Sequence, residues 1–119
     1  MEMTVTPLDG GVQLVSFNGA LDIAGTGEID LAFSAIAGSS LNIVVDLENV
    51  SYLASIGIRS IVANAKTVQR RGGKMVLLNP QPNVGEVLQV TGIDKVIPVC
   101  TDIDQALSEI SVTSPHAAS

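Results

Sequence analysis

The sequence predicts a single α/β domain built on a mixed, mostly parallel sheet. Two short apolar runs, at residues 41–47 and 74–79, have no polar alternation in their middle, which is typical of strands covered on both faces. A helical segment lies between them, and a strand, helix, strand order forms a right-handed parallel crossover. The 119 residues fit one domain and leave no room for two. We expect about five strands and about four helices.

An N-terminal β-hairpin and a first helix precede the central strand. Residues 4–8 and 12–17 are β-prone runs, and the Asp9-Gly10-Gly11 turn between them contains glycines that accept positive φ angles. Apolar residues at helical spacing from 29 to 37 then predict a helix, which the Gly-Ser-Ser segment at 38–40 ends. The strand at 41–47 follows this helix, and we expect it at the centre of the sheet.

The helix expected at about 56–71 has two different faces. One side carries an apolar stripe and predicts burial, whereas the other side carries Arg59, Lys66 and Arg70. We interpret the cations of this region as a solvated helix face rather than a nucleic-acid patch. Arg70 and Arg71 suit the negative end of the helix dipole.

The C-terminal half continues the alternation of helices and strands. A short helix within 84–90 ends at Gly92. A strand follows at 96–99, and Pro98 confines it to an edge of the sheet because proline has no N–H to donate. A last helix begins at Asp102.

The composition favours protein partners over nucleic acids and membranes. Six Lys and Arg against twelve Asp and Glu give a net charge of −6, which repels phosphate backbones and anionic membrane surfaces. Aromatic residues are 3% of the chain, so platforms for base stacking are scarce. No apolar stretch approaches the ~20 residues of a membrane span. We therefore expect a protein partner, no nucleic acid and no direct membrane insertion.

The two ends of the chain and the single cysteine predict a cytoplasmic protein with a short tail. Met1-Glu2-Met3-Thr4 carries an acidic residue where a signal peptide needs a basic region, and Cys100 cannot form an internal disulfide. The composition becomes small and polar from residue 111 onward. This change predicts a domain at 1–112 and a disordered C-terminal tail at 113–119.

Enzyme chemistry lacks the residues that it needs. The one histidine, His116, lies in the predicted tail, so a nucleophilic hydrolase has no base, and one Cys with one His cannot form a zinc site. Neither glycine-rich phosphate-binding loop occurs. Asp46 and Glu48 lie at the end of the central strand or in the loop after it, and we interpret them as solvated or bonded to the backbone rather than as an acid/base pair. We expect no enzyme activity, no metal and no cofactor.

A phosphoacceptor receiver domain shares the alternating α/β pattern. It needs an acidic pair after the first central strand and a lysine at the end of the last strand. Val99-Cys100-Thr101 stand in the place of that lysine. The sequence therefore does not favour Asp46 as a phosphoacceptor.

Ser55 is the most informative residue because it stands at the entrance of the two-faced helix. As an N-cap, its hydroxyl accepts a backbone N–H and stabilises the helix by about 1 kcal/mol. As a functional residue, it places a hydroxyl at the positive end of the helix dipole, where a phosphoryl group finds free N–H donors. Both readings are compatible, and we expect the cap.

The segment Ser55-Ile56-Gly57-Ile58 resembles the D-S-S-G-[LI] type motif of the STAS domain family, the anti-sigma factor antagonists and their relatives. The resemblance extends over nearly the whole chain to about residue 110, including Gly19-Ala20-Leu21-Asp22, residues 43–47 and Leu78-Asn79. The order of elements predicted above is similar to that of the family.

The resemblance implies a function as an anti-sigma factor antagonist. In that family, the serine that matches Ser55 is phosphorylated by an anti-sigma factor that is itself a serine kinase, and the aspartate that matches Asp22 lies near this partner. A PP2C-type phosphatase is the implied second partner, and we expect a monomer or weak dimer. The expected partner-binding residues are Asp22, Tyr52, Ala54, Ser55, Ile56, Gly57 and Arg59.

A second reading comes from a different functional class. Ala54 and Ile56 stand where many family members have an aspartate and a second serine. This difference favours a constitutive STAS scaffold, such as a subunit of a membrane-associated lipid transporter, in which Ser55 is a helix cap and not a phosphorylation site.

Overall fold

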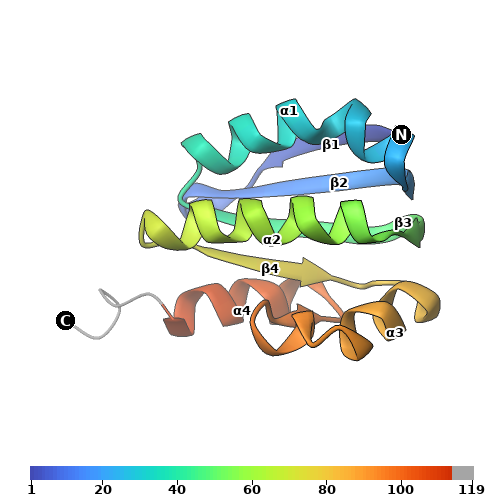
Figure 1. The fold of residues 1–119 in the computed structure, drawn as a ribbon. Coiled ribbons are helices and arrows are strands. Elements are labelled where there is room, and N and C mark those ends of the chain that lie inside the picture. Colours follow the sequence, from blue (N-terminus) through green and yellow to red (C-terminus); the bar gives the residue numbers. More distant parts are fainter. Residues whose placement is uncertain (114–119) are drawn as a thin grey trace.

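The sheet of the computed structural model, which describes residues 1–113, has five strands in the order of the sequence. The strands are β1 (Glu2–Pro7), β2 (Val12–Leu21), β3 (Asn42–Leu53), β4 (Lys74–Leu78) and β5 (Val99–Cys100). β1 pairs with β2 in an antiparallel hairpin, and each later strand adds in parallel, so that β3 lies at the centre (Figure 1). The predicted fold class, with its mostly parallel sheet and N-terminal hairpin, is confirmed.

Four α-helices and two 3₁₀ turns connect the strands. The helices are α1 (Ile23–Ser39), α2 (Ser55–Arg70), α3 (Pro82–Val90) and α4 (Ile103–Thr113). The 3₁₀ turns are η1 (Asp9–Gly11) in the hairpin and η2 (Ile93–Lys95) before β5. α1 and α2 lie side by side with parallel axes (Figure 1). None of the described helices is both long enough and apolar enough to cross a membrane.

The core consists of two clusters, one on each face of the sheet. Between the sheet and helices α1, α2 and α3, Phe17 of β2 meets Phe33 of α1 edge to face, with ring centroids 5.1 Å apart. On the opposite face, Val44 and Val76 pack against Ala106 of α4. The central strand is therefore covered on both faces, as its unbroken apolar sequence predicts.

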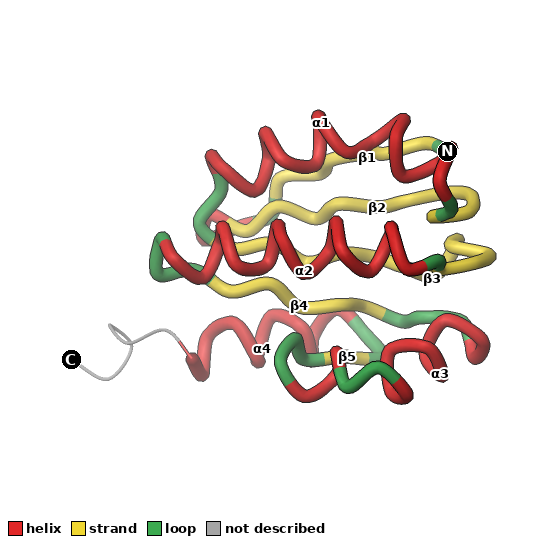
Figure 2. The backbone as a smooth tube through the Cα atoms, viewed as in Figure 1, coloured by secondary structure: helices red, strands yellow, loops and turns green. Residues whose placement is uncertain are grey.

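β2 and β3 are longer than the sequence predicts. β2 continues past residue 17 to Leu21, and β3 continues past residue 47 to Leu53. The last residue of β4 pairs with Asp46, so the ends of β2 and β3 project beyond β4 as a two-stranded ribbon (Figure 2). One side of this ribbon faces solvent, which explains why its polar residues resemble a loop in the sequence.

The last strand differs from the prediction in its position. Residues 96–98 of the predicted strand lie outside it, and β5 contains only Val99 and Cys100. The edge position is confirmed: Leu77 donates its N–H to the carbonyl oxygen of Pro98 at 2.9 Å, a bond that needs no N–H from the proline. Of the predicted tail, Thr113 still belongs to α4, and residues 114–119 lie outside the described residues.

Cys100 is 2% exposed and belongs to the apolar cluster under α4. Burial raises the pKa of this thiol, the carboxylates of Glu109 and Asp102 add to the increase, and Lys74 opposes it. We therefore expect iodoacetamide to alkylate the native protein at pH 8 at least about tenfold more slowly than the urea-unfolded protein. Mass spectrometry of timed samples measures both rates. Equal rates would contradict the buried position of the thiol.

Candidate partner-binding site

The first turns of α1 and α2 meet at one end of the sheet because β2 and β3 run in parallel to the same edge. The register pairs Leu21 with Leu53, the last residues of the two strands. Just beyond this pair, Ala54 donates its N–H to the carbonyl oxygen of Leu21 at 3.0 Å. Both helices begin within two residues of this contact, at the right-hand end of the sheet in Figure 1.

Asp22 is the N-cap of α1. Its Oδ1 accepts the N–H of Gly25 at 2.7 Å, which satisfies one of the unpaired donors of the first turn. A Cβ on Gly25 would lie 1.9 Å from the carbonyl oxygen of Ala20, so only glycine lets the helix pass this close to β2. The carboxylate of Asp22 thus has a structural role, and it remains only half-buried at the edge of the site.

Ser55 does not cap α2, and this prediction was wrong. The N-cap is Ala54, which keeps an extended backbone because its N–H bonds to the end of β2, and whose carbonyl oxygen accepts the N–H of Ile58 at 3.0 Å. The helix therefore begins at Ser55 itself. The Ser55 side chain is exposed, and its hydroxyl has no hydrogen-bond partner among residues 1–113.

Gly57 lies on the buried side of α2. A Cβ at this position would lie 2.8 Å from the carbonyl oxygen of Leu21 and 2.9 Å from its Cβ. The glycine therefore lets α2 approach the end of β2, and it has no surface to offer a partner. Its role at the site is to position the neighbouring residues.

The surface that remains at this edge is partly apolar. Ser55, Ile56 and Arg59 are exposed, with Ile56 at 37%, and Ala54 is half-buried. Tyr52 is 54% exposed. Because successive side chains of a strand point to opposite faces, Tyr52 lies on the face of the sheet opposite Leu53 and α2.

Sequence reasoning missed Ile23, which is 77% exposed in the first turn of α1. An apolar residue directly after the capping Asp22 is the signal that was available. Its exposure adds apolar area at the point where the two helices begin.

No group of three or more His, Cys, Asp or Glu side chains in residues 1–113 is placed to hold a metal ion. The Oδ1 atom of Asp46 accepts the N–H of Glu48 at 3.0 Å, which confirms the backbone hydrogen bond expected for this aspartate.

A family model for the STAS domain matches residues 4–106. The chain belongs to the STAS domain family. The anti-sigma F factor antagonist of Paenibacillus polymyxa is 30% identical over 73 residues, which cover 61% of this chain and 62% of that protein.

Solved structures with this STAS fold include several proteins described as anti-sigma factor antagonists. One from Mycobacterium paratuberculosis has a TM-score of 0.82 and 27% identity, and the match covers 92% of both chains. The antagonist SpoIIAA, solved in its unphosphorylated form, has a TM-score of 0.75 and 20% identity over 92% of this chain and 96% of that one. SpoIIAA of Bacillus in its phosphorylated form shares the fold as well, with a TM-score of 0.69 and 20% identity over 92% and 99% of the two chains.

Two glycines of α1 provide a matched test of how the site is positioned. Gly25→Ala is expected to lower the free energy of unfolding by about 1–3 kcal/mol, because its Cβ meets the Ala20 carbonyl oxygen. Gly27→Ala is expected to raise it by roughly 0.5–1 kcal/mol, because Gly27 has open space around its Cβ position and alanine favours helix. Urea denaturation measures both changes. A shift of the same sign in both variants would contradict the close approach of α1 to β2.

Proposed function

We propose that this STAS domain is an anti-sigma factor antagonist, a regulatory binding protein and not an enzyme. In its unphosphorylated form it binds an anti-sigma factor that is also a serine kinase, and it releases that partner when Ser55 is phosphorylated. A PP2C-type phosphatase then restores the binding form. The exposed, unbonded hydroxyl of Ser55 at the start of α2 carries this proposal.

The comparisons support the general role. The relatives named above are described as anti-sigma factor antagonists, and the family model spans most of this chain. SpoIIAA, which has the same fold, has been solved in both a phosphorylated and an unphosphorylated form. The cytoplasm, where sigma factors act, is the compartment that this function requires.

The position of Ser55 suits a phosphoacceptor. A capping hydroxyl would have to give up its backbone hydrogen bond before it reached a kinase, whereas this hydroxyl has no such bond among the described residues. A phosphate on the first residue of α2 would lie beside the free N–H groups of the first turn and the positive end of the helix dipole. The domain itself therefore tolerates the modification.

The partner interface would not tolerate it in the same way. Phosphorylation adds about −1.5 to −2 charges directly beside Ile56, whose apolar side chain is part of the proposed contact surface. Desolvating this dianion against a surface that fits a neutral serine costs several kcal/mol, and each ~1.4 kcal/mol is tenfold in affinity. The unphosphorylated protein thus binds the partner and the phosphorylated protein does not, although both have the same fold.

The scaffold reading remains the second candidate, because Ala54 and Ile56 replace the polar neighbours found in many family members. In that case, the same edge of the sheet binds its partner permanently. An experiment can separate the two candidates. Only the phosphorylation switch requires the partner to distinguish a neutral side chain from an anionic one at position 55.

Ser55→Asp is expected to weaken binding of the partner at least about tenfold relative to Ser55→Ala, because it places a charge in the interface. Both variants serve as baits for affinity capture from the native cytosol, and mass spectrometry identifies the proteins that each retains. Calorimetric titration with the recovered partner then gives the two affinities.

Ser34→Asp is the matched control, since Ser34 is exposed on α1 away from the site. It is expected to bind as the unchanged protein does. Recovery of an ATP-binding anti-sigma factor by Ser55→Ala alone supports the switch. Equal retention of one partner by both Ser55 variants would support the scaffold instead.

A further inference from the structure

The outward face of α2 carries a cationic strip. Arg59, Lys66 and Arg70 are seven and then four residues apart, a spacing that places them on one face of a helix. They border a shallow groove whose apolar part comprises Ile58 and Val62. We call this surface the α2 groove; it lies on the side of α2 away from the sheet, with Ser55 at its N-terminal end. Ile58 and Val62 are half-buried at its border, where they also pack against the core.

The three cations of the α2 groove are not used by the fold. In the described part of the chain, Arg59, Lys66 and Arg70 make neither a hydrogen bond nor an ion pair. The two cations that follow α2 differ in this respect. Arg71 donates to the carbonyl oxygens of Ala37 and Ser40 at the end of α1.

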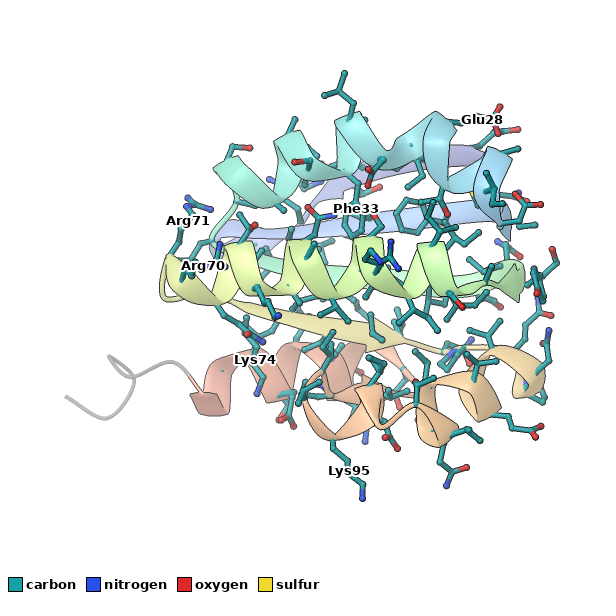
Figure 3. All side chains as sticks on the ribbon, viewed as in Figure 1. Glu28, Phe33, Arg70, Arg71, Lys74 and Lys95 are labelled. Carbon is teal, nitrogen blue, oxygen red and sulfur yellow. The ribbon has the colours of Figure 1, made fainter. Side chains whose placement is uncertain are left out.

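Lys74 also takes part in the fold. It forms a 3.1 Å ion pair with Glu109 of α4. Figure 3 shows Arg70, Arg71 and Lys74 near the C-terminal end of α2, whereas Lys95 points away on the other side of the molecule. Hydrogen bonds and an ion pair of the fold therefore use Arg71 and Lys74, whereas the three cations of the strip have no such partner among the described residues.

The strip is exceptional in the charge distribution of this molecule. The chain has a net charge of −6, and yet α2 contains no Asp or Glu between residues 55 and 70. The nearest carboxylate contact of the helix is on its other side, where Ser60 donates to Asp30 of α1 at 2.6 Å. A chain that is acidic overall thus has one helix face that carries three cations and no carboxylate of its own.

We propose that the α2 groove binds an acidic amphipathic helix of a partner protein. The cations extend over about 16 Å along α2, the length of roughly three helical turns, so carboxylates one to two turns apart on a partner helix can face them. Apolar residues of that helix would cover Ile58 and Val62. This surface goes beyond the proposed function, because it requires neither a kinase nor a phosphate.

Charge and shape favour a protein helix over the other polyanions. A nucleic acid or an anionic membrane presents many negative charges at once to a molecule with a net charge of −6, and three cations do not offset that repulsion. Neither a nucleic acid nor a membrane headgroup surface would contact the apolar side chains of Ile58 and Val62 beside the cations. A helix with a few carboxylates and an apolar stripe matches both features of the groove and adds little net charge.

A synthetic 18-residue helical peptide tests the proposal, with Glu at positions 3, 10 and 14 and Leu at 6, 7 and 13. We expect it to shift the amide resonances of residues 58–70 in ¹H–¹⁵N spectra of the full chain. We expect Lys66→Gln with Arg70→Gln to weaken its binding by about fivefold, and salt to weaken it further. Lys95→Gln is the matched control and should leave the affinity unchanged.

A scrambled peptide of the same composition should produce no such shifts. Absence of peptide binding, equal binding of the scrambled peptide, or an affinity that the double variant leaves unchanged would overturn the proposal. Binding to phosphatidylglycerol vesicles without binding to the peptide would overturn it in favour of a membrane. Ser55 is unchanged throughout, so these outcomes are separate from those of the Ser55 variants.

Discussion

The parallel pairing of β2 and β3 to their last residues is the constraint on which the site depends. It brings Leu21 beside Leu53, and the hydrogen bond from Ala54 to the Leu21 carbonyl oxygen closes the pair. Because each strand leads directly into a helix, two helix N-termini are fixed at one edge of the sheet. A slip of the register by one residue would turn the side chains at these strand ends to the opposite face of the sheet and move the helix starts apart.

The same hydrogen bond explains why Ser55 is available. It holds Ala54 in an extended conformation, so the cap position falls on a residue that has no side-chain acceptor, and the serine becomes the first helical residue. Glycine at positions 25 and 57 then lets both helices pass close to the end of β2. Buried backbone contacts thus fix the geometry, and the exposed side chains remain free to bind. The same holds along the whole of α2, where one face packs in the core and the opposite face carries the cationic strip.

Much of this architecture could be predicted from the sequence, because unbroken apolar runs and helical periodicity report burial directly. The ends of β2 and β3 could not, since they form a ribbon beyond β4 with one side in solvent, and Glu48 and Asn49 there are as polar as loop residues. The cap at Ser55 was predicted from residue preference, and a long-range hydrogen bond from Ala54 overrides that preference. Ile23 was missed because an exposed apolar side chain has no signal in periodicity.

We propose that phosphorylation of Ser55 changes a surface and not the fold. Incorporation of phosphoserine at position 55 by genetic code expansion, followed by ¹H–¹⁵N spectra and urea denaturation, tests it directly. We expect resonance changes confined to the first turn of α2 and the neighbouring start of α1, and a free energy of unfolding within about 1 kcal/mol of the unmodified protein. Resonance changes throughout β3 and β4, or loss of cooperative unfolding, would contradict it.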